Sequence, residues 1–288
     1  MNIDRKILAC VDNTPMAEVV TDYASWAARR LDAPVELLHV LERHVEALPR
    51  SGPQRLDRPR RPGETHGPAH PGGCRAHPQR PQRARPRLLS VLRERAIRGG
   101  AAIVDSRLRH GDIEETLAEQ QEGSRLLIIG RNARPKPDAR AGLGKTPGWV
   151  VRSATRPVLL VTEAFREPKR VLFAFDGSSV TRKGVDMLAA SPLLRGLQLQ
   201  LLTAGESGTA GQPGHSTLRF RHCRPAASKP APAFGPAHRK EVIAGALAEG
   251  GIDMLVMGAY SHSPLRNLFG SKTTEMLKAT CVPTLLLR

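Results

Sequence analysis

The sequence predicts an α/β protein made of two tandem, doubly wound domains, each with a mainly parallel sheet. Two observations support this fold class. Short apolar runs typical of buried strands alternate with amphipathic segments typical of helices, and this alternation implies a parallel sheet with helices on both faces. The same succession then occurs a second time along the chain. With 288 residues, the chain is long enough for two domains that each bury a core.

The first half opens with a strand, Lys6–Val11, and a second strand follows at Val35–Leu41. Between them, apolar side chains recur every three to four residues, which predicts an amphipathic helix, at Met16, Val20, Tyr23 and Ala27. The later elements predicted for this half are strand Ala102–Leu108, helix Asp112–Gln121, strand Arg125–Ile129, helix Lys145–Ser153 and strand Pro157–Thr162.

The second half repeats this plan. The run DRKILACVDNT matches PKRVLFAFDGS, SRLLIIGRN matches IDMLVMGAY, and ATRPVLLVTE matches ATCVPTLLLR. We therefore expect domains at 1–164 and 165–288. Counterparts are found for all elements except the third strand and the helix before it. If the missing strand is an edge, the second sheet ends at strand Leu197–Ala204 with an unpaired rim.

Two segments, 50–87 and 205–240, differ in composition from the rest. The first has eight prolines, five glycines and one large aliphatic residue, Leu56. It cannot bury enough apolar surface to offset chain entropy. We expect both segments to be largely irregular, with TLRFRHC, from Thr217, as a weak strand candidate.

The bias of these segments toward Arg, Pro, Gly and Ala is that of GC-rich coding sequence translated out of frame. We hypothesise that compensating frame slips produced them. A natural disordered basic arm is the alternative. Resequencing the gene tests the hypothesis, and a clean read with no in-frame alternative of globular composition would contradict it.

The formal net charge is +17, a balance typical of proteins that bind nucleic acid or anionic membranes. Segment 50–87 contributes +8 and segment 205–240 contributes +5, which leaves +4 for the rest of the chain. We therefore expect neither nucleic acid nor a membrane as a partner. Because no apolar run is long enough for a membrane helix and no signal peptide is evident, we expect a cytoplasmic location.

The four cysteines show no paired spacing, so neither a disulfide framework nor a zinc site is predicted. Cys10 and Cys281 are interpreted as packed strand residues. One cluster has spacings that suggest a metal site, but it lies in a His-rich tract and is interpreted as chance: His66, His70, Cys74 and His77.

The paired pattern resembles the universal stress protein family in its tandem, two-domain form. The resemblance rests on an aspartate after the first strand, a glycine after the fourth, a Gly-Ser pair at the last helix, and the closing strands. The residues are Asp12 and Asp176, Gly130 and Gly258, and Gly270 with Ser271. It implies a five-stranded sheet ordered 3-2-1-4-5 in each half. It also implies a contact between the final strands, which a tandem chain can make as an intramolecular pseudo-dimer.

Members of this family that bind ATP resemble one another in a loop of the form G-x2-G-x9-G-[S/T], with the adenosine held by the first aspartate and the end of the second strand. In the second half, Ser261 stands for the second glycine, and eight residues rather than nine precede Gly270. In the first half, Ala133 stands for that glycine and Lys145 follows Gly144. The first half therefore departs further from the pattern.

The resemblance thus implies a main set of candidate nucleotide-binding residues, Asp176, Ala204, Gly258, Ser261, Gly270 and Ser271. A weaker set comprises Asp12, Val40, Gly130 and Gly144. The alternative is that the glycines serve only turns and helix starts. The run ARAGLGKT nearly spells a P-loop, but it lacks the first glycine and a strand leading directly into it.

The expected function is binding and regulation in the stress response, with ATP and Mg²⁺, or another adenine nucleotide, as the candidate ligand. Weak ATP hydrolysis and charge-driven nucleic-acid binding are the alternatives. We assign no catalytic or metal-binding residue. The lone aspartates are expected to contact a ligand or cap a turn, and His39, at a strand end, is interpreted as packed or solvated.

Overall fold

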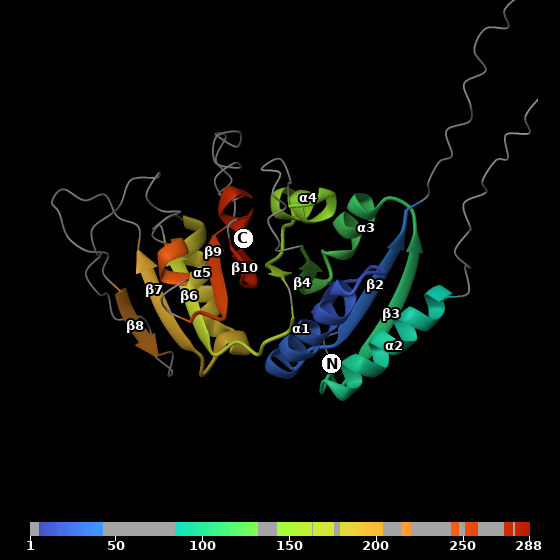
Figure 1. The fold of residues 1–288 in the computed structure, drawn as a ribbon, viewed down its shortest axis with the longest axis horizontal. Helices are drawn as coiled ribbons and strands as arrows, with labels where there is room; N and C mark the ends of the chain where they lie inside the picture. The colour runs from blue at the N-terminus through green and yellow to red at the C-terminus, as the bar shows by residue number, and fades with distance from the viewer. Residues whose placement is uncertain are drawn as a thin grey trace, which may run out of the picture.

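The computed structural model describes residues 6–42, 84–131, 143–162, 164–175, 179–203, 215–219, 243–247, 251–258, 274–278 and 280–288. It is an elongated α/β structure with the two halves side by side (Figure 1). The first half contains β1 (Lys6–Cys10), α1 (Met16–Leu31), β2 (Val35–Leu41), α2 (Ala84–Arg98), β3 (Val104–His110), α3 (Ile113–Gln120), β4 (Ser124–Gly130), α4 (Lys145–Ser153) and β5 (Val158–Val161). The second contains β6 (Arg170–Phe175), α5 (Ser179–Ala190), η2 (Pro192–Leu194), β7 (Gln198–Thr203), β8 (His215–Arg219), β9 (Met254–Gly258) and β10 (Thr284–Leu287). Residues 243–247 and 274–278 are also helical.

All these strands lie in one sheet, in the order β3-β2-β1-β4-β5-β10-β9-β6-β7-β8. The strands of the first half are parallel neighbours, in the order that the family resemblance implies. The halves join where β5 and β10 pair antiparallel, with Leu160 opposite Thr284 and Val158 opposite Leu286. We call this pairing the seam. Both sides of β5 and both sides of β10 are therefore hydrogen-bonded.

The second half has a strand, β8, in the third-strand position that we expected to be empty. β8 runs antiparallel to β7, with Leu199 opposite Leu218. A parallel return would need a crossover of about a dozen residues or more, usually a helix. Only residues 204–214 separate β7 from β8, and this length suits an antiparallel return. The open edge of this half is therefore β8 and not β7.

α2 begins inside the segment that we expected to be irregular, because residues 84–87 are helical. Leu89, Leu92 and Ala96 are buried and recur at helical spacing, so they supply the apolar burial that the preceding residues lack. Pro86 lies in the first helical turn, where its missing N–H costs no hydrogen bond. The remainder of both unusual segments lies outside the described residues, apart from β8.

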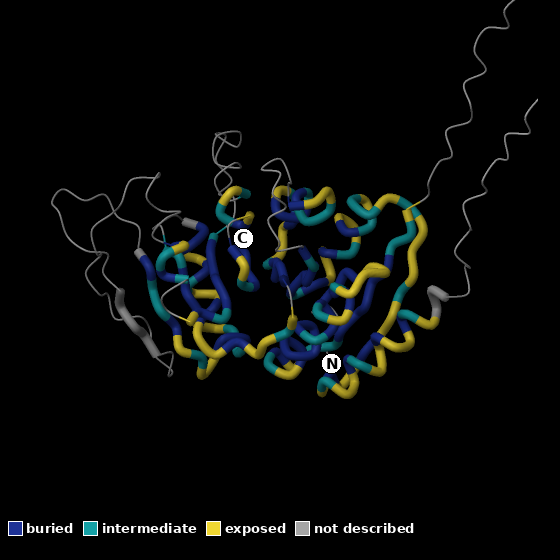
Figure 2. Tube along the Cα trace, viewed as in Figure 1, coloured by how far each residue is buried: buried dark blue, intermediate teal, exposed yellow. Residues whose placement is uncertain are grey.

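Buried side chains form one layer on each face of the sheet, and both layers continue from one half to the other. Figure 2 shows buried residues along the strands of both halves. The layer under α1, α2 and α5 includes Trp26 from the first half and Phe173 from the second. The layer on the opposite face includes Leu127 and Val150 together with Leu286. Apolar burial therefore holds the halves together along with strand pairing.

α1 is fixed at both ends by local hydrogen bonds. At its start, the Met16 N–H donates to Thr14 Oγ1 at 3.2 Å. At its end, Asp32 adopts the left-handed conformation, with φ 48° and ψ 56°, and its N–H donates to Ala28 O. This conformation is costly for residues other than glycine, and a carboxylate is unfavourable at the negative end of a helix. The C-terminal end of α1 is thus strained.

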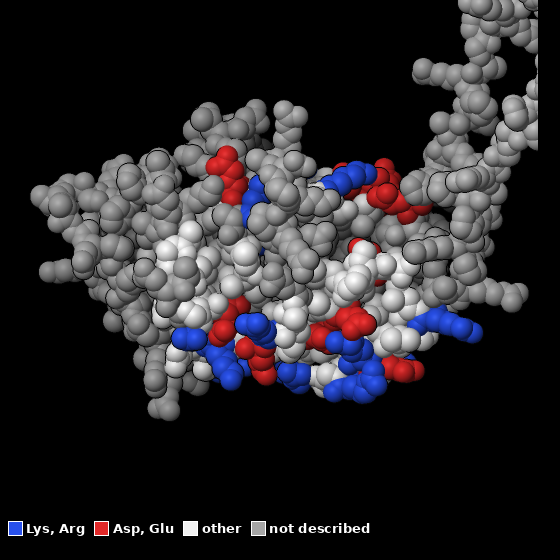
Figure 3. Space-filling view, viewed as in Figure 1, with Lys and Arg blue, Asp and Glu red and all other residues white. Residues whose placement is uncertain are grey.

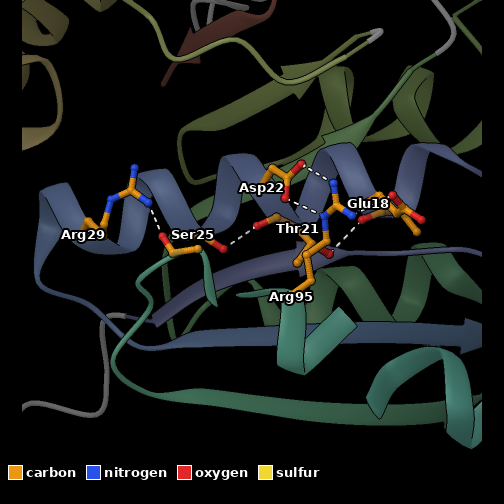
Figure 4. Close-up of polar contacts among 8 residues, drawn as sticks. Glu18, Thr21, Asp22, Ser25, Arg29 and Arg95 are labelled. Carbon is orange, nitrogen blue, oxygen red and sulfur yellow. Dashed lines mark hydrogen bonds and ion pairs between the residues drawn. The ribbon is translucent and has the colours of Figure 1, made fainter. Parts of the chain in front are cut away.

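Arg95 of α2 fastens that helix to α1 (Figure 4). Its Nε and Nη2 atoms donate to the two carboxylate oxygens of Asp22 at 2.6 and 2.8 Å, and Nη1 donates to Glu18 Oε2 at 2.7 Å. The hydrogen bond to Asp22 is the main cause of the raised pKa of Arg95. Along this side of the molecule, cationic and anionic side chains are interspersed (Figure 3). The surface around α1 and α2 is therefore of mixed sign.

The two described cysteines lie in different environments. Cys10 is buried on β1, and this burial, with a smaller contribution from Asp12, raises the pKa of its thiol to about 12. The interpretation of Cys10 as a packed residue is confirmed. Cys281 is exposed, so the same interpretation is wrong for that residue. It precedes β10, which begins only after Pro283.

Replacing Asp32 with glycine is expected to stabilise the protein, because it relieves the left-handed conformation and removes a negative charge from the helix end. The free energy of unfolding, measured by urea denaturation, should rise by about 0.5–1 kcal/mol. Asp32→Ala is the control, since it removes the charge but keeps a Cβ at the same backbone angles. Equal stability of the two variants would contradict the backbone explanation.

Alkylation should distinguish the two described cysteines. The thiolate is the reactive form of cysteine, so we expect iodoacetamide at pH 8 to modify Cys281 in the folded protein while Cys10 stays unmodified. In urea both should react. Peptide mapping by mass spectrometry measures the two rates, and similar native-state rates would show that Cys10 is not protected.

Candidate functional site

In the first half, the carboxyl ends of β1, β2 and β4 meet at one edge of the sheet. Cys10 of β1 is level with Leu38 of β2 and with Ile129 of β4. The strand ends therefore bring three predicted residues to the same edge: Asp12, Val40 and Gly130. Strand order reverses at β1, with β2 on one side and β4 on the other. Open α/β sheets bind ligands outside such a reversal.

Asp12 is exposed and forms the turn that leads into α1. Its Oδ1 atom accepts hydrogen bonds from the Thr14 N–H at 3.1 Å and from Thr14 Oγ1 at 2.6 Å. The same hydroxyl oxygen accepts the Met16 N–H. Asp12 therefore stabilises the turn that precedes α1.

His39 ties the ends of β1 and β2 together. Its ring is buried, with 5% exposed, and Nδ1 lies 2.8 Å from Val11 O. Because a carbonyl oxygen only accepts, Nδ1 carries the proton in this contact. The Val11 N–H also donates to Leu38 O at 2.9 Å. Of the two interpretations of His39, the packed one is confirmed.

The glycines that end β4 and β9 make room for helices. A Cβ on Gly130 would overlap Met16 Cγ at the start of α1, and a Cβ on Gly258 would lie 2.8 Å from Thr181 Cγ2 of α5. Such separations are too short for real Cβ contacts, so each helix can approach its strand only because the residue there has no side chain. Both glycines thus have a packing role in addition to any contact with a ligand.

Gly144 and Lys145 form the start of α4. Gly144 has φ 95°, which favours glycine, and its carbonyl accepts the Gly148 N–H at 3.0 Å. Lys145 Nζ lies 3.9 Å from Glu42 Oε1, and the Lys145 side chain is 69% exposed. This ion pair is weak because of its exposure. It nevertheless shows that the start of α4 lies beside the end of β2, two residues beyond Val40.

Arg131 is a residue that the sequence analysis missed. It follows Gly130 directly, is only 3% exposed, and donates from Nη2 to Thr280 O in the second half. Burial lowers its pKa to about 10, so the guanidinium remains charged at neutral pH. No local sequence pattern could have identified this contact, because 149 positions separate Arg131 from its partner.

The second half has the same arrangement of strand ends around β6. Phe175 at the end of β6 is opposite Thr203 at the end of β7, and Ala174 is opposite Met257 of β9. Gly258, the last residue of β9, therefore lies at the sheet edge where β6 and β7 end. The other residues of the main candidate set lie outside the described residues: Asp176, Ala204, Ser261, Gly270 and Ser271.

Within the described parts of the chain, no group of three or more His, Cys, Asp or Glu residues could hold a metal ion. The cluster His66, His70, Cys74 and His77 falls in residues that the structure does not describe. None of the described helices is both long enough and apolar enough to span a membrane.

Comparison with known proteins places this arrangement in a family. The model of the universal stress protein family matches residues 5–162. The chain is also similar to a universal stress protein from Synechocystis sp., with 26% identity over 290 residues that cover 99% of this chain and 100% of the relative.

Two solved structures share the fold over both halves. A universal stress protein from Archaeoglobus fulgidus is 12% identical, with a TM-score of 0.62, over 98% of this chain and 96% of that one. A functionally unknown protein from Pseudomonas aeruginosa is 16% identical, with a TM-score of 0.62, over 99% of this chain and 93% of that one. The family model covers more than half of the sequence, and the second half repeats the strand order of the first. The chain therefore belongs to the universal stress protein family, in its tandem form.

Proposed function

We propose that this protein is a cytoplasmic binding and regulatory protein of the stress response that holds an adenine nucleotide, ATP with Mg²⁺, in its second half. The observation that carries the proposal is the register of β6, β7 and β9, whose ends lie level at one edge of the sheet. The nucleotide would be held by the residues that leave this edge and by the loop after β9, namely Asp176, Ala204, Gly258, Ser261, Gly270 and Ser271.

The topology around β6 supports this location. β7 lies on one side of β6 and β9 on the other, so the strand order reverses at β6. Such a reversal opens a crevice outside the carboxyl ends of the strands, where backbone N–H groups can meet a phosphate. Gly258 is the last residue of β9 and stands at this edge of the sheet.

The first half is the weaker candidate for the same ligand. Oδ1 of Asp12 already accepts two hydrogen bonds from Thr14. Ala133 replaces the loop's second glycine, and Lys145 replaces its serine or threonine. We therefore propose one nucleotide for each chain. The paired β5 and β10 support the further proposal that the halves form an intramolecular pseudo-dimer.

The role that we propose is regulatory, and we assign no catalytic residue. The described residues at the two strand-end edges serve turns, strand ties and helix packing: Asp12, His39, Gly130 and Gly258. A nucleotide bound at such an edge changes the local charge. A partner protein can recognise that change.

Calorimetric titration of the full chain with ATP and Mg²⁺ tests the proposal. We expect saturable binding near one nucleotide per chain. In the double variant Gly270→Val, Ser271→Ala, binding should be at least about tenfold weaker, since the valine side chain would block close backbone approach of a phosphate. Gly258 is left unchanged, because a side chain there would disturb α5.

Two single variants complete this experiment. Lys145→Ala probes the first half, and Arg152→Ala removes the same charge from the other end of α4. Binding that is weakened by Lys145→Ala but not by the double variant would place the nucleotide in the first half and contradict the proposal. No binding heat from a chain shown by circular dichroism to be folded would contradict nucleotide binding altogether.

A further inference from the structure

Two arginines cross the seam in opposite directions. Arg131, directly after β4, donates from Nη2 to Thr280 O in the second half. Arg288, directly after β10, donates from Nη2 to Val150 O at 3.0 Å and to Val151 O at 2.7 Å in the first half. Each arginine thus leaves the carboxyl end of a strand in one half and ends on backbone carbonyls of the other half.

The carbonyls that Arg288 contacts lie in the last turn of α4. The Ala154 N–H still bonds to Val150 O at 3.0 Å. The next amide, Thr155 N–H, donates instead to the side chain of Gln121 at 2.9 Å. Val151 O therefore receives no hydrogen bond from the Thr155 N–H, the bond that would have continued the helix. Arg288 supplies a charged donor to that oxygen, at the helix end that carries partial negative charge.

Arg131 contacts the second half just beyond the helical segment 274–278. Thr280 lies in the turn that follows this segment and is tied to it, since Thr280 Oγ1 donates to Met276 O at 2.7 Å and the Thr280 N–H donates to Leu277 O. Arg131 Nη2 donates a hydrogen bond to the Thr280 carbonyl oxygen. Thr162 Oγ1, also from the first half, donates to the next carbonyl, Cys281 O, at 2.8 Å.

The antiparallel seam explains why both contacts occur. A helix that leads into a parallel strand runs back across the sheet, so it ends at the amino edge of its own half. Because β5 and β10 are antiparallel, the amino edge of each half lies beside the carboxyl edge of the other. A side chain that leaves one carboxyl edge can therefore reach the other half's last helix at its C-terminal end.

We propose that Arg131 and Arg288 are reciprocal caps, each of which holds the end of the last helix of the other half. Gly144 directly precedes α4, and the segment 274–278 follows Gly270 and Ser271 in the sequence, so both helices come directly after the candidate nucleotide loops. The caps therefore make each loop depend on the opposite half. This last step rests on the proposed function, whereas the capping itself does not.

Hydrogen exchange of the ligand-free full chain, read by mass spectrometry, tests the caps. Arg288→Met keeps most of the side-chain stem and removes the guanidinium. In that variant, amides in the last turn of α4 should exchange about tenfold faster, while those of β1 stay unchanged. Arg288→Lys keeps a cation, so the exchange rates of these α4 amides should lie between those of the parent chain and those of Arg288→Met. Arg156→Met is the matched control, because Arg156 donates to Glu122 O at 2.8 Å within its own half.

Arg131→Met should produce the converse pattern, with faster exchange in residues 274–280 and no change in α4. Faster exchange in α4 for Arg288→Met and in residues 274–280 for Arg131→Met supports the proposal. It is overturned if Arg288→Met leaves α4 unchanged. It is equally overturned if exchange rises to the same extent in α4, β1 and 274–280, because that would be general destabilisation.

Titration of Arg131→Met with ATP and Mg²⁺ then tests the link to the ligand, and binding should be about threefold weaker. If the parent chain binds no ATP, the proposed function fails while the exchange results still decide whether the caps exist. If the parent chain binds ATP and the variant binds it equally well, the caps are not coupled to the nucleotide.

Discussion

The antiparallel pairing of β5 with β10 is the constraint on which the rest of the structure depends. It turns two five-stranded sheets into one and carries both apolar layers across the junction. It also sets the direction of each half, so that the carboxyl end of β5 lies beside the amino end of β10. The polar contacts of Arg131, Thr162 and Arg288 are consequences of that direction.

The family's characteristic glycines have an additional explanation in this chain. Gly130 and Gly258 lie where the first helix of each half passes over the fourth strand, and neither position has space for a Cβ. Packing alone can therefore require these glycines. In the proposed function, nucleotide binding depends on residues farther along the loops, where the two halves differ in sequence. The second half keeps the Gly270-Ser271 pair, whereas the first has Gly144-Lys145.

Most of the fold could be predicted from the sequence because its elements are locally encoded. The bounds of β2 and α4 match the expected ranges, since an apolar run and a helical period define them. β8 was predicted only in part: the alternating run from Thr217 was a weak strand candidate, whereas the start at His215 and the antiparallel pairing with β7 were not expected. They depend on contact with β7, and the segment itself has an unusual composition. The first turn of α2 was missed for a related reason: the apolar residues that stabilise it lie outside the segment that suggested irregularity.

The candidate site could be predicted only in outline. Asp12 and Gly130 were candidates because the family resemblance implied them, and the strand register brings both to the same sheet edge. Their actual contacts, with Thr14 and Met16, depend on how α1 starts. Arg131 and Arg288 could not be found at all, because each is an unremarkable cation in sequence and its partners are more than a hundred positions away. Long-range carbonyl contacts leave no local pattern.

The order of the strands also shows where in the sheet the segments of unusual composition lie. The unusual segment 50–87 leads into α2 and then β3, and the segment 205–240 contains β8. β3 and β8 are the two outermost strands of the sheet, the positions farthest from the seam. The segments of unusual composition therefore lie at the margins of the sheet, while the strands at the seam are apolar and buried. Because the halves are joined at the centre of the sheet, an unusual composition at its edges does not remove the contact that unites them.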